Sequence, residues 1–188
     1  MSQTDSDHAA ADAVVAHHSE LAAALTRHVA SVRAAARAGS DARWREPRQR
    51  LVTWLRTELL PHAAAEETAM YRPAMAQDRG RLLVEGMLAE HRAIGRLVAE
   101  LETAGTAVDA AGAARALAAL VEVHLDKENS LVLPLLLATD GVSLAGILGG
   151  MHELLGSSEQ AAHGGCGCGC DHAEAADLPA PLLTLDAG

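Results

Sequence analysis

The sequence is nearly free of aromatic residues, with no Phe, one Tyr and two Trp among its 188 residues. Its apolar fraction of 49% comes mostly from Ala, Leu and Val. Alanine is the strongest helix former and leucine is close behind, so this composition predicts an all-helical protein and gives no indication of a sheet. A chain of this length can bury a proper core, and we expect one domain followed by a tail.

Basic residues and long apolar runs are also scarce. Lys and Arg number 15 against 25 Asp and Glu, and the formal net charge of −10 argues against nucleic acid or an anionic membrane as a partner. The longest apolar run, Leu131 to Ala138, contains Pro134 and is too short to cross a bilayer. Met1 to Asp7 is polar and acidic, so we expect no secretory signal.

The only three cysteines lie together in the tract Cys166-Gly-Cys168-Gly-Cys170. An odd number at this tight spacing does not fit a disulfide framework, and a reducing cytoplasm fits best. Flanked by His163 and His172, the tract could bind a soft cation or supply reductant to a metal site. The alternative is a disordered tail whose thiols have no function.

Apolar residues at helical spacing predict four long helices, over about residues 12–38, 42–75, 81–103 and 113–137, with a loop over 105–112. A shorter amphipathic segment over 143–155 is expected to lie across one end. The predicted fold is therefore all-α, an antiparallel up-down-up-down four-helix bundle over residues 12–156 with a short fifth helix. Residues 1–11 are expected to be disordered, and residues 157–188 to form a flexible tail.

Histidine and glutamate repeat inside the apolar stripes of these helices. His62 precedes Glu66 by four residues, and His124 precedes Glu128 by four. Residues four apart lie on one helical face with roughly 6 Å between their Cβ atoms, so each pair can reach one metal ion. A single inward histidine, His18 or His91, stands on the helix before each pair.

The stripes also predict which neighbours point inward. Pro61 removes a backbone hydrogen bond just before His62, so we expect a kink there. Beyond the glutamates, the inward face is expected to continue through Pro73 on the second helix and through Leu131 and Leu135 on the fourth.

Burial of Glu66 and Glu128 would be costly without a cation, because an isolated carboxylate in an apolar core costs several kcal/mol. No inward Lys or Arg is expected near them, whereas four imidazoles are. Four imidazoles and two carboxylates can satisfy two metal ions if both carboxylates bridge and solvent supplies the remaining ligands. This donor set suits iron, manganese or zinc and lacks the thiolates of a structural zinc site.

The ordered set of motifs resembles the hemerythrin-like HHE cation-binding family, over roughly residues 12–156. The motifs are His17-His18-Ser-Glu-Leu21, His62-x3-Glu66-Glu67 with Met70-Tyr71-x-Pro73, Glu90-His91-Arg-Ala-Ile94, and His124-x3-Glu128 with Leu133-Pro134. The resemblance implies a non-haem site of two iron ions with a bridging oxo or hydroxo group. It implies that His18 and His62 hold one iron, His91 and His124 the other, and that Glu66 and Glu128 bridge them.

Two departures from the oxygen-carrying members bear on function. Those members have His-x3-His on the third helix, and this chain has Gly95 at the second position. Their fourth-helix carboxylate is Asp at i+5, whereas Glu128 stands at i+4 from His124. The set is similar to that of di-iron proteins linked to nitric oxide response and iron–sulfur cluster repair. Those proteins carry an additional N-terminal cysteine domain, which we do not expect in this chain.

We therefore expect a cytoplasmic stress-response protein that binds and reacts with hydrogen peroxide, nitric oxide or oxygen, and that uses a separate electron donor. A peroxide- or NO-consuming, catalase-like oxidoreductase is one form of this expectation. A non-catalytic oxygen-binding, iron-buffering or sensor protein is the other, and a zinc-bound structural bundle is a remote third. The sequence singles out no catalytic side chain.

Several assignments stay open from the sequence alone. His17 competes with His18, because a one-residue error in the helix boundary exchanges them. Glu58 and Glu67 are expected to be solvated or to lie just outside the metal ligands, although Glu58, four residues before His62, could become an extra ligand. Tyr71 and Met87 are expected to pack in the core, although a tyrosine near an open iron position could bind it.

With Gly95 in place of the second histidine, one iron would lack a third imidazole and keep an open coordination position. Replacement of Gly95 by His tests the role of that position. The added imidazole should occupy that position and lower the rate of peroxide loss of the iron-loaded protein, measured as peroxide absorbance against time. An unchanged rate at equal iron content would show that the open position has no bearing on reactivity.

Overall fold

The computed structural model describes residues 2–39 and 43–150 and is all-helical there, with no strand. The predicted tail, including Cys166, Cys168 and Cys170, lies outside the described residues. The elements are α1 (Gln3–Arg37), α2 (Arg45–Trp54), η1 (Leu55–Leu59), α3 (Leu60–Glu66), η2 (Glu67–Tyr71), α4 (Arg72–Met75), α5 (Arg81–Thr103), α6 (Ala107–Lys127), η3 (Glu128–Val132) and α7 (Leu133–Leu137).

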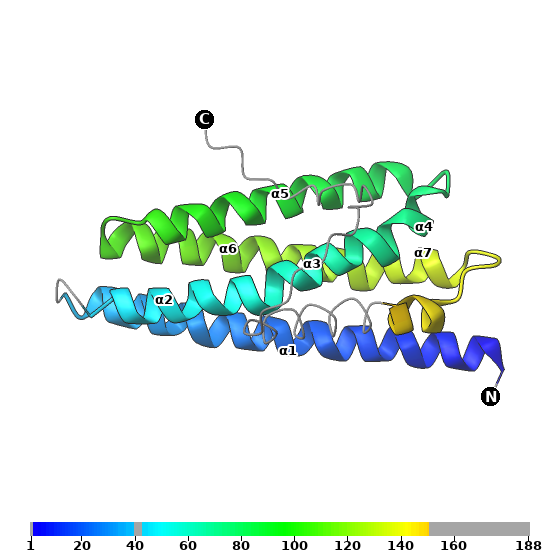
Figure 1. Ribbon diagram of the computed structural model, residues 1–188, viewed down its shortest axis with the longest axis horizontal. Helices are drawn as coiled ribbons and strands as arrows, with labels where there is room; N and C mark the ends of the chain where they lie inside the picture. The colour runs from blue at the N-terminus through cyan, green and yellow to red at the C-terminus, as the bar shows by residue number, and fades with distance from the viewer. Residues whose placement is uncertain (1, 40–42, 151–188) are drawn as a thin grey trace, which may run out of the picture.

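The helices form a bundle whose long members lie side by side (Figure 1). α1 packs against α2 and α6, and α5 also packs against α2 and α6. The segments α2, η1, α3, η2 and α4 follow one another without a break and make one long rod; α6, η3 and α7 make another. α5 has the predicted bounds, and its buried residues recur at helical spacing: Val84, Met87, His91, Ile94, Gly95, Val98 and Leu101.

Two helices begin earlier than the sequence predicted, because Ser2 and Thr106 cap their first turns. α1 starts at Gln3: the Ser2 hydroxyl accepts a hydrogen bond from the Asp5 N–H, and the Asp5 carboxylate accepts one from the Ser2 N–H. The expectation of disorder is therefore wrong for residues 3–11. α6 starts at Ala107, where Thr106 accepts from the Asp109 N–H, so the expected loop over 105–112 is also wrong. Both starts are ordinary N-caps.

Three of the four prolines in the two composite rods follow a π-helical segment, and the fourth, Pro47, lies in the first turn of α2. Pro61 comes after η1, Pro73 after η2 and Pro134 after η3, always as the second residue of the next α-helical piece. Proline has no N–H to donate, and its ring clashes with the carbonyl four residues earlier. A π-type turn inserts one extra residue and relaxes both conflicts. The predicted kink at Pro61 thus takes the form of a π-helical bulge just before it.

The extra residue also moves the inward stripe by one position. Beyond Glu66 the buried residues are Met70, Tyr71 and Ala74, and Pro73 is only partly buried. The expectation that Pro73 points inward is therefore wrong.

The same shift occurs after Glu128. Val132, Leu133 and Leu136 are buried there, whereas Leu131 is 48% exposed and Leu135 is only partly buried. A strict 3.6-residue period selected Leu131 and Leu135, and the bulge replaces them with their neighbours.

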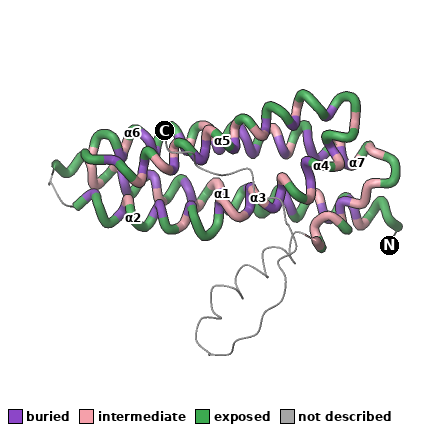
Figure 2. Tube along the Cα trace, turned by 45° about the horizontal axis from the view of Figure 1, so that its top comes forward, coloured by how far each residue is buried: buried purple, intermediate pink, exposed green. Residues whose placement is uncertain are grey.

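Two apolar clusters fill the bundle, one toward each end, and the predicted metal ligands lie between them. On α1, His18 separates Val14 of one cluster from Leu21 of the other. On α5, His91 likewise separates Met87 from Ile94. Figure 2 shows the buried positions recurring along each rod. The apolar core is thus interrupted by one buried polar layer.

The predicted fifth helix is present over residues 144–150, and the rest of its expected span lies outside the described residues. Leu144 is buried against the apolar cluster that contains Val14. Asp7 of α1 holds the start of this helix, because its carboxylate accepts hydrogen bonds from the Ala145 N–H at 2.9 Å and the Ser143 hydroxyl at 3.1 Å.

Replacing Asp7 with Ala should release residues 143–150 from α1. The Ala145 N–H, helped by Ser143 and Gln3 and opposed by burial, lowers the pKa of Asp7. A lowered folded pKa means that this stabilisation is present above the ordinary value near 4 and is lost as pH falls through the folded value. Hydrogen exchange at pH 7 should therefore be faster over 145–147 in the variant.

The matched variant is Asp7→Asn, which keeps an acceptor oxygen and removes the charge. Its protection over 145–147 should lie between wild type and Asp7→Ala, with the acid-dependent loss removed. Equal exchange in all three proteins would contradict a capping role for Asp7.

Candidate metal centre

Six predicted site residues meet in the polar layer, and they come from α1, α5 and both composite rods. Each is at most 4% exposed. They are His18 on α1, His62 and Glu66 on α3, His91 on α5, His124 on α6 and Glu128 at the start of η3.

Glu66 lies between two pairs of imidazoles. Its Oε1 is 3.2 Å from His18 Nε2 and 2.8 Å from His62 Nε2. Its Oε2 is 3.8 Å from His91 Nε2. The potential ligand atoms therefore fall into two groups that share Glu66, one with His18 and His62 and one with His91, His124 and Glu128.

Glu128 faces both pairs in the same manner. Its Oε1 is 3.6 Å from His124 Nε2, and its Oε2 is 3.8 Å from His18 Nε2. Within the described residues, the charged partners of Glu66 and Glu128 are imidazoles alone. Each carboxylate thus has one oxygen on the side of each histidine pair, the arrangement that a bridging carboxylate requires.

Tyr71 belongs to this layer as well. Its hydroxyl donates a 2.5 Å hydrogen bond to Glu128 Oε1 and is 3.4 Å from Nε2 of both His91 and His124. The side chain is 1% exposed. Tyr71 is buried in the core as expected, and its hydroxyl oxygen also lies among the ligand atoms, the place that the alternative role of binding iron would require.

Three of the four imidazoles donate outward through Nδ1. His18 donates to Asn129 Oδ1 at 2.8 Å, His91 to Glu67 Oε1 at 2.8 Å and His124 to Glu90 Oε2 at 3.0 Å. Lys127 in turn donates to Glu90. An Nδ1–H bond of this kind fixes the tautomer and leaves the Nε2 lone pair facing inward.

The inward lone pairs need a cation between them. His91 Nε2 and His124 Nε2 are only 2.9 Å apart. With both Nδ1 atoms donating outward, neither Nε2 carries a hydrogen in the neutral rings, so the two lone pairs repel each other unless a proton or a metal ion lies between them. The buried Glu128 Oε2 has no hydrogen-bond partner among the described residues, and His62 Nε2 lies 2.8 Å from Glu66 Oε1 without the alignment of a hydrogen bond. The residues present therefore fit a metal ion.

Burial and mutual charge drive the pKa values of the two carboxyls apart. Burial alone would raise the pKa of Glu66, but His62 and His18 hold it well below the ordinary value. Burial and the charge of Glu66 raise the pKa of Glu128 well above its ordinary value. Without a metal, Glu66 is therefore the more acidic carboxyl of the two, and Glu128 keeps its proton to higher pH.

The pKa values of the imidazoles are also shifted in different directions. Burial, with the neighbouring His91, lowers the pKa of His124 to about 4. Burial would lower the pKa of His62 too, but the Glu66 carboxylate raises it. His124 is consequently a neutral donor at physiological pH, which is the form that binds a metal.

The remaining candidates lie outside the cluster of ligand atoms. His17 is exposed and only its ring edge meets His62, with 4.9 Å between ring centroids, so the structure brings His18 rather than His17 into the layer. Glu58 is exposed, Met87 is buried in an apolar cluster, and Gly95 is buried on α5.

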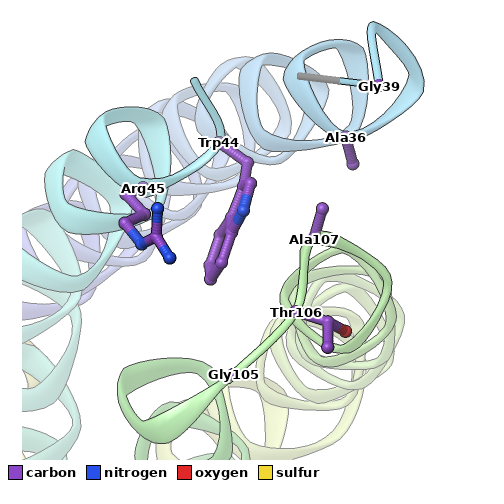
Figure 3. A pocket seen from close by; sticks show the side chains of 7 residues that line it. All are labelled: Ala36, Gly39, Trp44, Arg45, Gly105, Thr106 and Ala107. Atoms are coloured by element: carbon purple, nitrogen blue, oxygen red, sulfur yellow. The ribbon is translucent and has the colours of Figure 1, made fainter. Parts of the chain in front are cut away.

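A separate open pocket of about 410 Å³ lies at one end of the bundle, away from the polar layer, and contains none of these residues (Figure 3). Its lining comes from the end of α1, the start of α2 and the start of α6: Ala36, Gly39, Trp44, Arg45, Gly105, Thr106 and Ala107.

The residues that accept the outward Nδ1 hydrogen bonds, here called the outer partners, are Glu67, Glu90 and Asn129. The sequence alone mostly did not identify them, although their positions share a simple pattern. Glu67 follows Glu66, Glu90 precedes His91 and Asn129 follows Glu128. A residue next to an inward one is turned about 100° around the helix, toward the neighbouring helix. Polar oxygens adjacent to a ligand position are therefore the places to look for such partners.

A helical bundle with a buried layer of imidazoles and carboxylates defines the class of metal-binding helical proteins. The model of the hemerythrin HHE cation binding domain matches residues 9–136, and the chain belongs to this family. The buried His/Glu cluster could hold the cation that the family description names. No curated protein and no solved structure matches the chain. Over residues 2–39 and 43–150, no helix is both long and apolar enough to cross a membrane.

Because the pKa values of Glu66 and Glu128 are shifted in opposite directions, we expect their replacement by Gln to change the stability of the metal-free protein by different amounts. Glu66→Gln removes a buried charge paired with His62 and should lower the free energy of unfolding by about 3 kcal/mol at pH 7. Because the folded pKa of Glu66 is lowered, its contribution is present at that pH and is lost only on acidification. Glu128→Gln imitates the protonated form and should change stability little.

Urea unfolding of the metal-free proteins at pH 7 measures both effects. Equal destabilisation by the two variants, or a larger effect of Glu128→Gln, would contradict the assignment of the charge to Glu66.

Proposed function

We propose that this chain is a non-haem di-iron protein that binds and reacts with a small oxidant, namely hydrogen peroxide, nitric oxide or oxygen. The observation that carries the proposal is the convergence of four imidazole Nε2 atoms on two shared carboxylates, with no Lys or Arg among the described charged partners of those carboxylates. His18 and His62 would hold one iron, His91 and His124 the other, and Glu66 and Glu128 would bridge them.

Iron bound here would supply Lewis acidity and one-electron redox chemistry, and a bridging oxo or hydroxo group completes the proposed centre. The chain's own residues supply the surroundings. The apolar clusters on both sides of the layer keep bulk water away from the ligand atoms. The hydrogen bond from Tyr71 holds Glu128 in place, and Asn129, Glu67 and Glu90 hold three of the imidazoles.

Gly95 supports reaction with an oxidant over simple carriage. It is buried on α5, one turn beyond His91, and offers no side chain as a ligand. An open coordination position would therefore lie on the His91 side of the layer, close to the Tyr71 hydroxyl oxygen, which is 3.4 Å from His91 Nε2.

Three further features belong to the proposal. The bundle has an antiparallel up-down-up-down four-helix topology, which is supported by the packing of α1 on α2 and α6 and of α5 on the same two. The protein acts in the cytoplasm, which is supported by three cysteines that lie in one tight tract and do not fit a disulfide framework. Reduction of an oxidant at iron would also need a source of electrons, so the proposal includes a separate electron donor.

A non-catalytic oxygen carrier, iron buffer or sensor is the alternative. The burial of the whole ligand set favours it, since every ligand residue is at most 4% exposed and a small molecule must pass the apolar packing to reach it.

Iron analysis combined with optical spectra tests the proposal. The purified protein, reconstituted with ferrous iron, should hold about two irons per chain and change its spectrum on exposure to oxygen or NO. Glu66→Ala removes the shared ligand and should lose most of the iron, whereas the exposed Glu100→Ala should retain it.

Peroxide consumption separates the two functions. Many turnovers per chain support an oxidoreductase, and reversible oxygen uptake without turnover supports a carrier. Zinc at two per chain with no spectral response to any oxidant would contradict both.

A further inference from the structure

The outer partners of the four imidazoles follow a rule with one exception. A residue next to a ligand on one helix holds the imidazole of the next helix: Glu67 holds His91, Glu90 holds His124 and Asn129 holds His18. By the same rule, a residue of α1 next to His18 should accept a hydrogen bond from His62 Nδ1.

At that position α1 carries His17, whose ring meets His62 edge to face with an interplanar angle of 66°. The buried His62 Nδ1 has no hydrogen-bond partner among the described residues. His62 is thus the one imidazole of the four whose Nδ1 has no oxygen acceptor among the described residues.

The partners also differ in charge between the two halves of the layer. Both imidazoles of the His91/His124 pair donate to carboxylates, and Lys127 anchors one of these. In the other half, His18 donates to the neutral amide of Asn129. A carboxylate acceptor makes an imidazole a stronger donor to a metal and fixes its orientation. The Tyr71 hydroxyl adds a further oxygen on the His91/His124 side.

We propose that the two metal positions differ in affinity, with the His91/His124 position filling first and the His18/His62 position filling second and emptying first. Loss of an outer partner changes metal affinity by about 10–100-fold, so the two binding steps should be separated by a factor of that order. This inference rests on the proposed two-metal site and assigns the exchangeable ion to the half that contains His62.

Competition titration tests the order of filling. Ferrous iron is added to the metal-free protein in the absence of oxygen, with a coloured chelator that reports free iron. The wild type should bind two irons per chain in two resolved steps. Glu90→Gln removes the charge beside His124 and should weaken the first step about 10-fold while the second step is retained.

Gain-of-affinity variants separate this proposal from a general structural effect. Asn129→Asp is nearly isosteric and gives His18 a carboxylate acceptor, and His17→Glu offers a carboxylate to His62. Each should strengthen the second step by about 10-fold, which a merely destabilising substitution would not do. Glu100→Gln on α5, exposed and distant from the layer, should leave both steps unchanged and is the matched control.

The outcomes distinguish the inference from the proposed function. Two irons per chain with inseparable steps, or a first step that Glu90→Gln leaves unchanged, would overturn the inference and leave the two-iron site standing. Fewer than two irons per chain in the wild type would overturn the proposed function itself.

Discussion

The structure depends on one electrostatic constraint: Glu66 and Glu128 are both buried in the apolar interior of a helical bundle. Two carboxylates so close together cannot both be ionised in such surroundings without positive charge nearby. Among the described residues, that charge can come only from the surrounding imidazoles or from a bound cation. The outward Nδ1 hydrogen bonds favour the cation, because they leave Nε2 lone pairs turned toward the carboxylates.

The backbone accommodates this layer by local departures from the α-helix. η2 begins directly after Glu66, and η3 begins at Glu128, so each composite rod changes its winding where its ligands end. The extra residue in η2 turns Tyr71 into the layer beside the carboxylates. Proline follows each bulge and is compatible with it, because the displaced carbonyl no longer needs the missing N–H. Prolines and ligands together determine the geometry of the site.

Periodicity was sufficient to predict the helices and the six inward polar residues, because these lie at α-helical spacing up to Glu66 and Glu128. It failed beyond those two residues, since a π-type bulge adds one residue and exchanges Leu131 for Val132. It also failed at two helix starts, where hydrogen bonds of the Ser2 and Thr106 hydroxyls outweigh the weak apolar pattern.

The outer partners could not be ranked from one sequence, because their role depends on which helices are neighbours. Glu67 and Asn129 look like ordinary polar residues until α5 and α1 are placed beside them. His17 shows the reverse case. Its position relative to His18 was ambiguous in the sequence, and the bundle gives it a place against His62 and outside the ligand layer.

The most direct test of a two-metal layer is the anomalous scattering of iron in crystals of the loaded protein. Two difference peaks should appear within the polar layer, one beside His18 and His62 and one beside His91 and His124, with Glu66 contacting both. A single peak, or peaks elsewhere in the bundle, would contradict the central claim that the buried carboxylates are shared between two metal ions.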